Sequence, residues 1–173
     1  MTDAPTETIE RRRHVVGVVT SARLLSQTDL TDVPPVIALG FDAAAPIRAS
    51  GSLRGAKVSV RVRLSDETAE GLGGVVCSYA YALLDRNETE LLAYHWHPGS
   101  RFAAPPHPHL HVSAALRPAA PGGSRGVLPL DKVHLPTGPV PLAAFARMLV
   151  GEFGVEPRAA DWAARLAQDP VGG

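Results

Sequence analysis

Apolar and polar residues alternate most clearly in residues 57–64, KVSVRVRL. Val58, Val60, Val62 and Leu64 occupy every second position, and lysine, serine and arginine fill the positions between them. Successive side chains of a strand point to opposite faces of a sheet, so the segment predicts a strand with one covered face and one solvent-exposed, basic face.

Several other segments predict strands. The apolar runs 75–84 and 91–97 flank the sequence DRNE, whose aspartate and asparagine favour a turn, so we expect a β-hairpin there. Further strands are expected, from their β-branched or alternating residues, at 14–25, 36–41, 107–112 and 132–136.

The spacing becomes helical near the C-terminus. Leu142, Phe145, Leu149 and Phe153 would lie on one side of a helix, and a second helix is expected over residues 157–168. We therefore predict an α+β fold, with an antiparallel sheet of about five to seven strands and a C-terminal helical pair covering one face.

The length of 173 residues fits one domain. Residues 1–12 are polar and without apolar period, so we expect a loose tail there, a single α+β domain over 13–168, and a second tail over 169–173.

Composition and charge exclude several classes of protein. Lys+Arg and Asp+Glu balance at 17 each, so a whole-chain electrostatic grip on nucleic acid is not indicated. Cys77 is the single cysteine, which excludes a cysteine-rich zinc site. No stretch approaches the roughly 18 apolar residues of a membrane span, and the N-terminus lacks the apolar core of a signal peptide. We expect a soluble, cytoplasmic protein with no membrane partner.

Histidines gather in one part of the chain. Six of the seven fall within residues 95–134, and the segment HPHLHV places His107, His109 and His111 at alternate positions. In a strand these three imidazoles would line one face, with aliphatic side chains on the other. A hairpin arm that pairs alongside would add the two histidines of YHWH, which are His95 and His97.

One use of such a face is metal binding. A His-x-His pair on a strand can direct two imidazoles to one ion at about 2.0–2.1 Å, and a third histidine would leave a position open for water. Residues 91–130 contain no Asp or Glu, and an all-histidine set suits zinc or another divalent transition metal better than magnesium or calcium. The candidate metal ligands are His95, His97, His107 and His109.

A second use is acid–base catalysis without a cofactor, because a pKa near 6.5 lets one imidazole accept a proton while another donates one. The candidate catalytic residues are His107, His109 and His111. Candidates for binding a negatively charged substrate are Arg101, Arg117, Lys132 and His134. In a third interpretation, the histidines lie on a partly wet sheet face and have only a structural role.

The segment HPHLHVS, residues 107–113, resembles the motif of the histidine-triad nucleotide hydrolases and transferases. This resemblance implies that His109 is the nucleophile that takes up the nucleotidyl group, with His107 and His111 supporting it.

The layout of residues 76–153 is similar to that of the TumE-like toxins of bacterial toxin–antitoxin pairs. It comprises a tyrosine-containing hairpin, a His-x-His element, a short strand and a helix that carries FARMLVGEF. This resemblance maps the His-x-His pair onto His107 and His109, and it implies an RNA or nucleotide target and a cognate antitoxin.

Together these features predict a small bacterial protein with a histidine-lined, metal-binding site that acts on RNA or a nucleotide, as a toxin-like component. If the protein is an enzyme, a hydrolase of phosphodiesters or nucleotides is favoured. The alternatives are a histidine-triad-like nucleotidyl hydrolase, and a non-enzymatic binding protein whose histidines are structural or sequester a metal.

Overall fold

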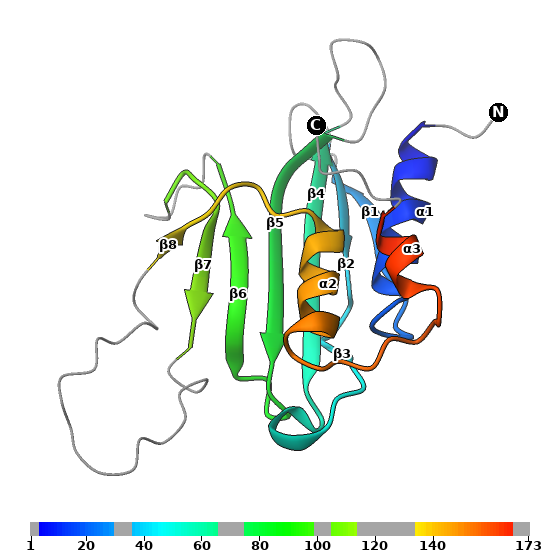
Figure 1. Cartoon of the computed structure of the whole chain (residues 1–173). Coiled ribbons are helices and arrows are strands. Elements are labelled where there is room, and N and C mark those ends of the chain that lie inside the picture. Colours follow the sequence, from blue (N-terminus) through cyan, green and yellow to red (C-terminus); the bar gives the residue numbers. More distant parts are fainter. Residues whose placement is uncertain (1–3, 30–35, 66–74, 99–104, 114–133, 168–173) are drawn as a thin grey trace.

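A computed structural model of the chain describes residues 4–29, 36–65, 75–98, 105–113 and 134–167. In this part of the chain, one antiparallel sheet carries three α-helices on one of its faces (Figure 1). The strands are β1 (Leu25–Asp29), β2 (Val36–Gly40), β3 (Ala45–Pro46), β4 (Lys57–Ser65), β5 (Val75–Leu84), β6 (Glu90–Trp96), β7 (His109–Val112) and β8 (Leu135–Pro136). The helices are α1 (Ala4–Val16), α2 (Leu142–Gly151) and α3 (Trp162–Ala167), with a 3-10 turn at Gly51–Leu53.

The sheet has the strand order β1-β2-β4-β5-β6-β7-β8. The short strand β3 pairs with the first two residues of β4, Lys57 and Val58. Every pairing is antiparallel. The predicted α+β class is therefore confirmed, with eight strands in the described residues, slightly more than the five to seven expected.

The alternation that predicted β4 is confirmed by burial. Its four aliphatic side chains are at most 2% exposed, whereas Arg61 on the opposite face is exposed. On the neighbouring strand, Tyr79, Tyr81 and Leu83 are buried on the same side as these aliphatic residues. This side of the sheet is the core face, and the helices pack on it.

The predicted β5–β6 hairpin is confirmed, and its turn follows from the aspartate. Oδ1 of Asp85 accepts hydrogen bonds from the backbone N–H groups of Asn87 and Thr89, both at 2.8 Å. Glu88 has a positive φ of 66° and pairs with Lys57 of β4 at 2.6 Å. The Asp85 side chain therefore supplies the hydrogen-bond acceptor for the backbone N–H groups of the turn.

The predicted C-terminal helical pair is confirmed as α2 and α3. Leu142, Phe145 and Leu149 of α2 are each at most 2% exposed, and the Phe145 ring stacks on Tyr81 with a centroid distance of 5.5 Å. Leu166 of α3 is also buried. Within the described ranges, no helix is both long enough and apolar enough to cross a bilayer.

The N-terminal expectation was wrong from Ala4 onward, because helix α1 takes up residues 4–12 of the predicted tail and the first three residues of the strand predicted over 14–25. Residues 17–24 of that predicted strand form turns and loop. Two ion pairs at helical spacing support it, Glu7 with Arg11 at 2.9 Å and Glu10 with Arg13 at 2.6 Å. The β-branched residues at its end enter the core as part of the helix and the following turn: Val15, Val16, Val18 and Val19.

The true first strand, β1, was missed. Residues 25–28 of this edge strand are all exposed, and Leu25 is 48% exposed. An edge strand that buries neither face has no apolar period, so its sequence carries no signal of a strand.

Candidate metal centre

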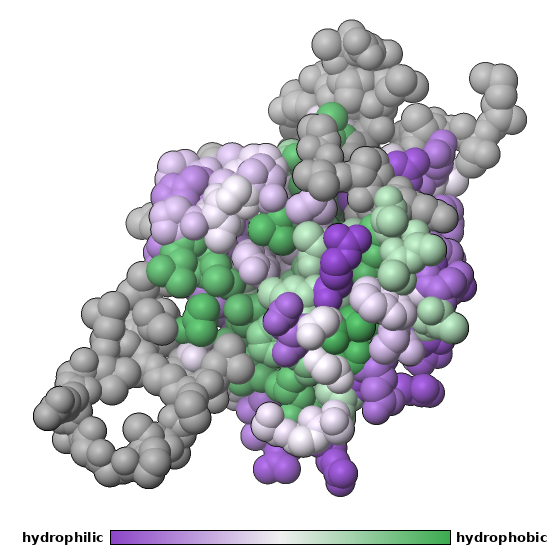
Figure 2. Space-filling model, viewed as in Figure 1, coloured by the Kyte–Doolittle hydropathy of each residue, from purple (hydrophilic) through white to green (hydrophobic). Residues whose placement is uncertain are grey.

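The pairing of β6 with β7 brings the histidines together. His95 lies directly opposite His109, and Ala93 lies opposite His111. One residue along, Tyr94 lies opposite Leu110 on the core face. Tyr94 contacts Met148 of α2, so His95 and His109, one residue along each strand, lie on the face away from the helices. Figure 2, viewed from the helix side, shows hydrophobic surface at this end of the sheet.

Strand β8 adds a further histidine at the edge. Pro136 and Leu135 pair with His109 and Leu110, so His134 reaches the level of His111. The Thr137 N–H donates to the Pro108 carbonyl at 2.8 Å, which fixes the segment to β7. His134 is exposed, and its ring centroid lies 4.6 Å from that of His111.

Six histidines thus form one cluster of neighbouring rings, called here the imidazole cluster: His95, His97, His107, His109, His111 and His134. His109 is at its centre, with ring centroids of His111 and His134 both 5.0 Å away. It is only 3% exposed. Small residues on neighbouring strands, Ala80 and Ala82 among them, share this face and leave room for the rings.

The hydrogen bonding of His109 defines which ring nitrogen is available. Its Nδ1 lies 2.9 Å from the carbonyl oxygen of His107. A carbonyl only accepts, so Nδ1 carries the proton and Nε2 of the neutral ring keeps its lone pair. Histidines that bind metals usually donate their other ring N–H to a carbonyl or carboxylate in this way.

Burial keeps the central imidazoles neutral. It lowers the pKa of His109 and of His111 below the ordinary value, and the charges of neighbouring histidines add to this effect. Burial likewise lowers the pKa of His97, with smaller contributions from neighbouring histidines and Arg63. Neutral imidazole is the form that binds a metal ion.

Among the residues that the structure describes, two groups of ligand atoms lie close enough to hold a metal ion. The first consists of His109, His111 and His134, and the second of Glu90, His95 and His111. Within each group the ligand atoms lie within 4.8 Å of one another. The first offers three imidazoles, and the second two imidazoles and a carboxylate; both sets are known for zinc sites that keep a position open for water.

Glu90 was missed from sequence, where the lack of Asp and Glu in residues 91–130 suggested a cluster without a carboxylate. Strict alternation from Leu92 would put Glu90 on the core face. The β5–β6 register shifts between Leu83 and Leu84, so that Leu83 pairs with Leu92 and Leu84 with Glu90. This β-bulge changes the alternation, and Oε2 of Glu90 comes to lie 3.9 Å from Nε2 of His95. His95, with a smaller contribution from His111, holds the pKa of the Glu90 carboxyl below its ordinary value, which keeps it charged at neutral pH.

The other predicted site residues are placed as follows. His97 and the exposed His107 belong to the imidazole cluster but to neither ligand group, whereas His134, predicted to bind substrate, belongs to the first. The roles assigned to these residues stay predictions. Three predicted substrate-binding residues lie outside the described residues: Arg101, Arg117 and Lys132.

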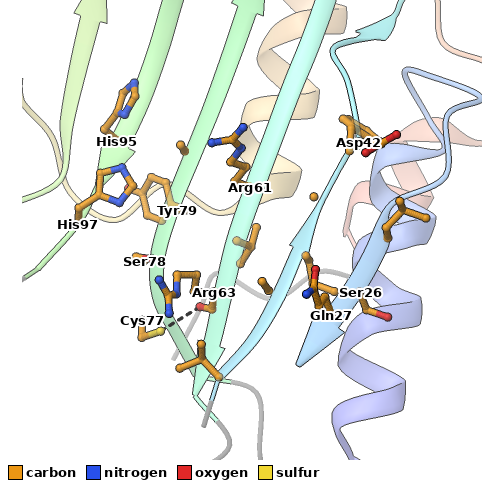
Figure 3. Close-up of a pocket in the computed structure, with 18 of the residues that line it drawn as sticks. Ser26, Gln27, Asp42, Arg61, Arg63, Cys77, Ser78, Tyr79, His95 and His97 are labelled. Carbon is orange, nitrogen blue, oxygen red and sulfur yellow. Dashed lines mark hydrogen bonds between the residues drawn. The ribbon is translucent and has the colours of Figure 1, made fainter. Parts of the chain in front are cut away.

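A hollow of about 1100 Å³ adjoins the imidazole cluster (Figure 3). His95 and His97 line one side of it, and Arg61 and Arg63 of β4 line its floor. Arg61 and His95 lie on either side of Ala80 in one row across the sheet. The predicted basic face of β4 therefore lies beside the histidines, a juxtaposition that the sequence did not indicate.

Comparisons with protein families, with curated proteins and with solved structures find no match for this chain. The resemblances to the histidine-triad enzymes and to the TumE-like toxins remain predictions.

Proposed function

We propose that this protein binds a divalent transition metal ion, with zinc the best fit to the donors, and hydrolyses a phosphate ester of RNA or of a nucleotide. The proposed ligands are His109, His111 and His134. The observation that carries the proposal is the central imidazole, His109: it is buried, its Nδ1–H is bound to a carbonyl, and its Nε2 is left for a ligand bond.

The residues fit a metal ion in donor type, and the lowered pKa values of His109 and His111 favour their metal-binding, neutral form. Three imidazoles with a remaining open position are typical of catalytic zinc. Tetrahedral zinc with bonds of about 2.0–2.1 Å needs ligand atoms about 3.4 Å apart, so binding would draw in the exposed His134 ring. Such an ion lowers the pKa of a bound water molecule and offsets the negative charge of a phosphate.

The arginines beside the cluster support an anionic substrate. The exposed guanidinium of Arg61 lies in the same row as His95, and Arg63 is close enough to His97 to affect its pKa. Arginine binds phosphate through a planar set of N–H donors. Because the formal net charge of the chain is zero, this local pair matters more than any overall attraction.

Burial distinguishes this proposal from covalent catalysis by His109. A nucleophilic imidazole needs an open approach to phosphorus, whereas His109 is 3% exposed and is flanked by neighbouring rings. Such a position suits a metal ligand better. A nucleotidyl adduct trapped on His109 would favour the histidine-triad-like reaction instead.

The experiment is hydrolysis of a short RNA and of a chromogenic phosphodiester by untagged protein. We expect chelator treatment and His134→Ala each to reduce the rate by at least about 10- to 100-fold, with zinc restoring only the unsubstituted protein. His14→Ala is the matched control, because His14 is exposed on α1 and outside the imidazole cluster. Activity that survives complete metal removal would contradict the proposal and favour metal-free acid–base histidines. Tight zinc binding with no hydrolysis of either substrate would favour metal sequestration.

A further inference from the structure

Beside the three-histidine group, a carboxylate and two imidazoles converge on the same face of the sheet. We infer that Glu90, His95 and His111 bind a second divalent metal ion, so that the cluster holds two ions with His111 shared between them. The inference rests on the proposed function, since the second ion would adjoin the ion proposed there.

The first argument is an unsatisfied atom. Nε2 of His95 is buried and has no hydrogen-bond partner in the described structure. Its nearest carboxylate oxygen, Oε2 of Glu90, is 3.9 Å away, which is too far for a hydrogen bond. A buried polar atom without a partner costs about 1–3 kcal/mol, so the site as it stands lacks an interaction.

A metal ion would supply that interaction. Zinc bonds to imidazole nitrogen are about 2.0–2.1 Å long and those to carboxylate oxygen about 2.0–2.2 Å. The sum of two such bonds, about 4.0–4.3 Å, exceeds the 3.9 Å gap, so one ion can contact both atoms, and drawing them about 0.5 Å closer gives the tetrahedral spacing. The negative charge of Glu90 also offsets part of the charge of the ion.

His111 is placed to serve both ions. Its ring centroid lies 4.8 Å from that of His95 on one side and 4.6 Å from that of His134 on the other. Imidazole has two ring nitrogens, and it can offer one to each ion when its ring proton is released to solvent. A negatively charged ring between two cations reduces their mutual repulsion.

The bulge in the hairpin supports a built site. Without the register shift between Leu83 and Leu84, the Glu90 side chain would belong to the core face. Between Glu90 and His95 on the imidazole face lies Ala93, which is fully buried and carries only a methyl group. Both side chains can therefore extend toward each other across it. Bulges commonly re-aim a side chain next to a functional site.

The test measures how many zinc ions each protein molecule binds. Zinc is titrated into metal-free, untagged protein by calorimetry, and zinc retained after desalting is measured by mass spectrometry. We expect two ions in the parent protein, one in Glu90→Gln, one in His134→Ala and none in the double variant. The matched control is Glu152→Gln, an exposed position at the end of α2, which should retain both. Circular dichroism reports whether each variant is folded.

The outcomes separate this inference from the proposed function. Two ions retained by Glu90→Gln, or a single ion in the parent that Glu90→Gln also retains, would overturn the second site. A single ion lost in Glu90→Gln but retained in His134→Ala would support the site at Glu90 and overturn the three-histidine site. No zinc bound by the parent protein would overturn both.

Discussion

On one side of the β6–β7 pair, Tyr94 and Leu110 lie opposite each other and face the helix layer, and Tyr94 contacts Met148 of α2. One residue along each strand, His95 and His109 lie opposite each other on the other side. The backbone pairing of β6 with β7 thus supports two chemically different surfaces, one on each face of the sheet. The core face stabilises the fold by removing apolar area from water. The imidazole face buries polar rings, a cost that hydrogen bonds or a metal ion must offset. Substitutions on the two faces should therefore have separable effects.

The largest effect is expected on the core face. Phe145→Ala removes a ring that is 2% exposed and contacts Tyr81 and Tyr94, so we expect a loss of about 3–5 kcal/mol in the free energy of unfolding. Urea denaturation of the metal-free protein measures it. Zinc affinity should not change in the fraction that stays folded. A loss below about 1 kcal/mol would show that α2 does not hold the core.

On the imidazole face, a substitution should weaken zinc binding more than it destabilises the fold. His109→Ala should reduce zinc affinity by at least about 100-fold, because it removes a ligand and not only an outer contact. The metal-free protein should lose less stability than with Phe145→Ala. Competition with a chromogenic chelator gives the affinity, and His14→Ala provides the reference. Unchanged zinc affinity in His109→Ala would place the site elsewhere.

Acid should lower the stability of the protein through the imidazole face. The pKa values of His97, His109 and His111 are lowered in the folded protein, whereas the unfolded chain binds protons near pH 6.5. The stability that these neutral imidazoles contribute is therefore complete above about pH 6.5 and is lost as the pH falls toward their lowered values.

Urea denaturation of the metal-free protein between pH 7.5 and 5 measures this dependence. We expect the free energy of unfolding to fall with pH, and His111→Gln to make the fall shallower. His14→Gln, which changes an exposed histidine, should leave the slope as it is. Stability that is independent of pH across this range would mean that the imidazoles are not held neutral by burial.

The smallest effect is expected at the margin of the imidazole face. Arg61→Ala should leave the free energy of unfolding within about 0.5 kcal/mol, because the side chain is exposed. It should raise the KM for RNA by about three- to tenfold, and the difference should shrink as salt is added. Arg147 is exposed on α2, in the helix layer on the other face of the sheet. Arg147→Ala should therefore change neither the free energy of unfolding nor the KM. Equal KM values for both variants would remove Arg61 from the substrate site.

The sequence predicted regular alternation well and its interruptions poorly. In β4 and β7 each apolar residue faces the core and each polar residue faces away, so these strands and the shared face of His109 and His111 follow from spacing alone. The strand expected from residue 107 begins only at His109, so His107 lies before it. The position of Glu90 on the imidazole face could not be predicted from the sequence. It depends on a β-bulge that the spacing of apolar residues does not reveal. In the sequence, Glu90 also lies between the predicted turn and the first apolar residues of the strand, where a solvent-exposed glutamate is ordinary.

Helix α1 and strand β1 were missed for a different reason. The valines before Gly17 favour a strand by local preference, but packing against the core keeps them in a helix end. Strand β1 has a polar, exposed sequence, and only its pairing with β2 makes it a strand. Likewise, no local pattern shows that Arg61 lies in one row with His95, since that depends on the order of β4, β5 and β6 in the sheet.

The measurement that tests the central claim most directly is an anomalous difference map at the zinc absorption edge, from crystals of untagged protein grown with zinc. The account predicts a peak enclosed by the rings of His109, His111 and His134, and the loss of that peak in His134→Ala. No peak on the imidazole face, or one bound only by His97 and His107, would contradict it.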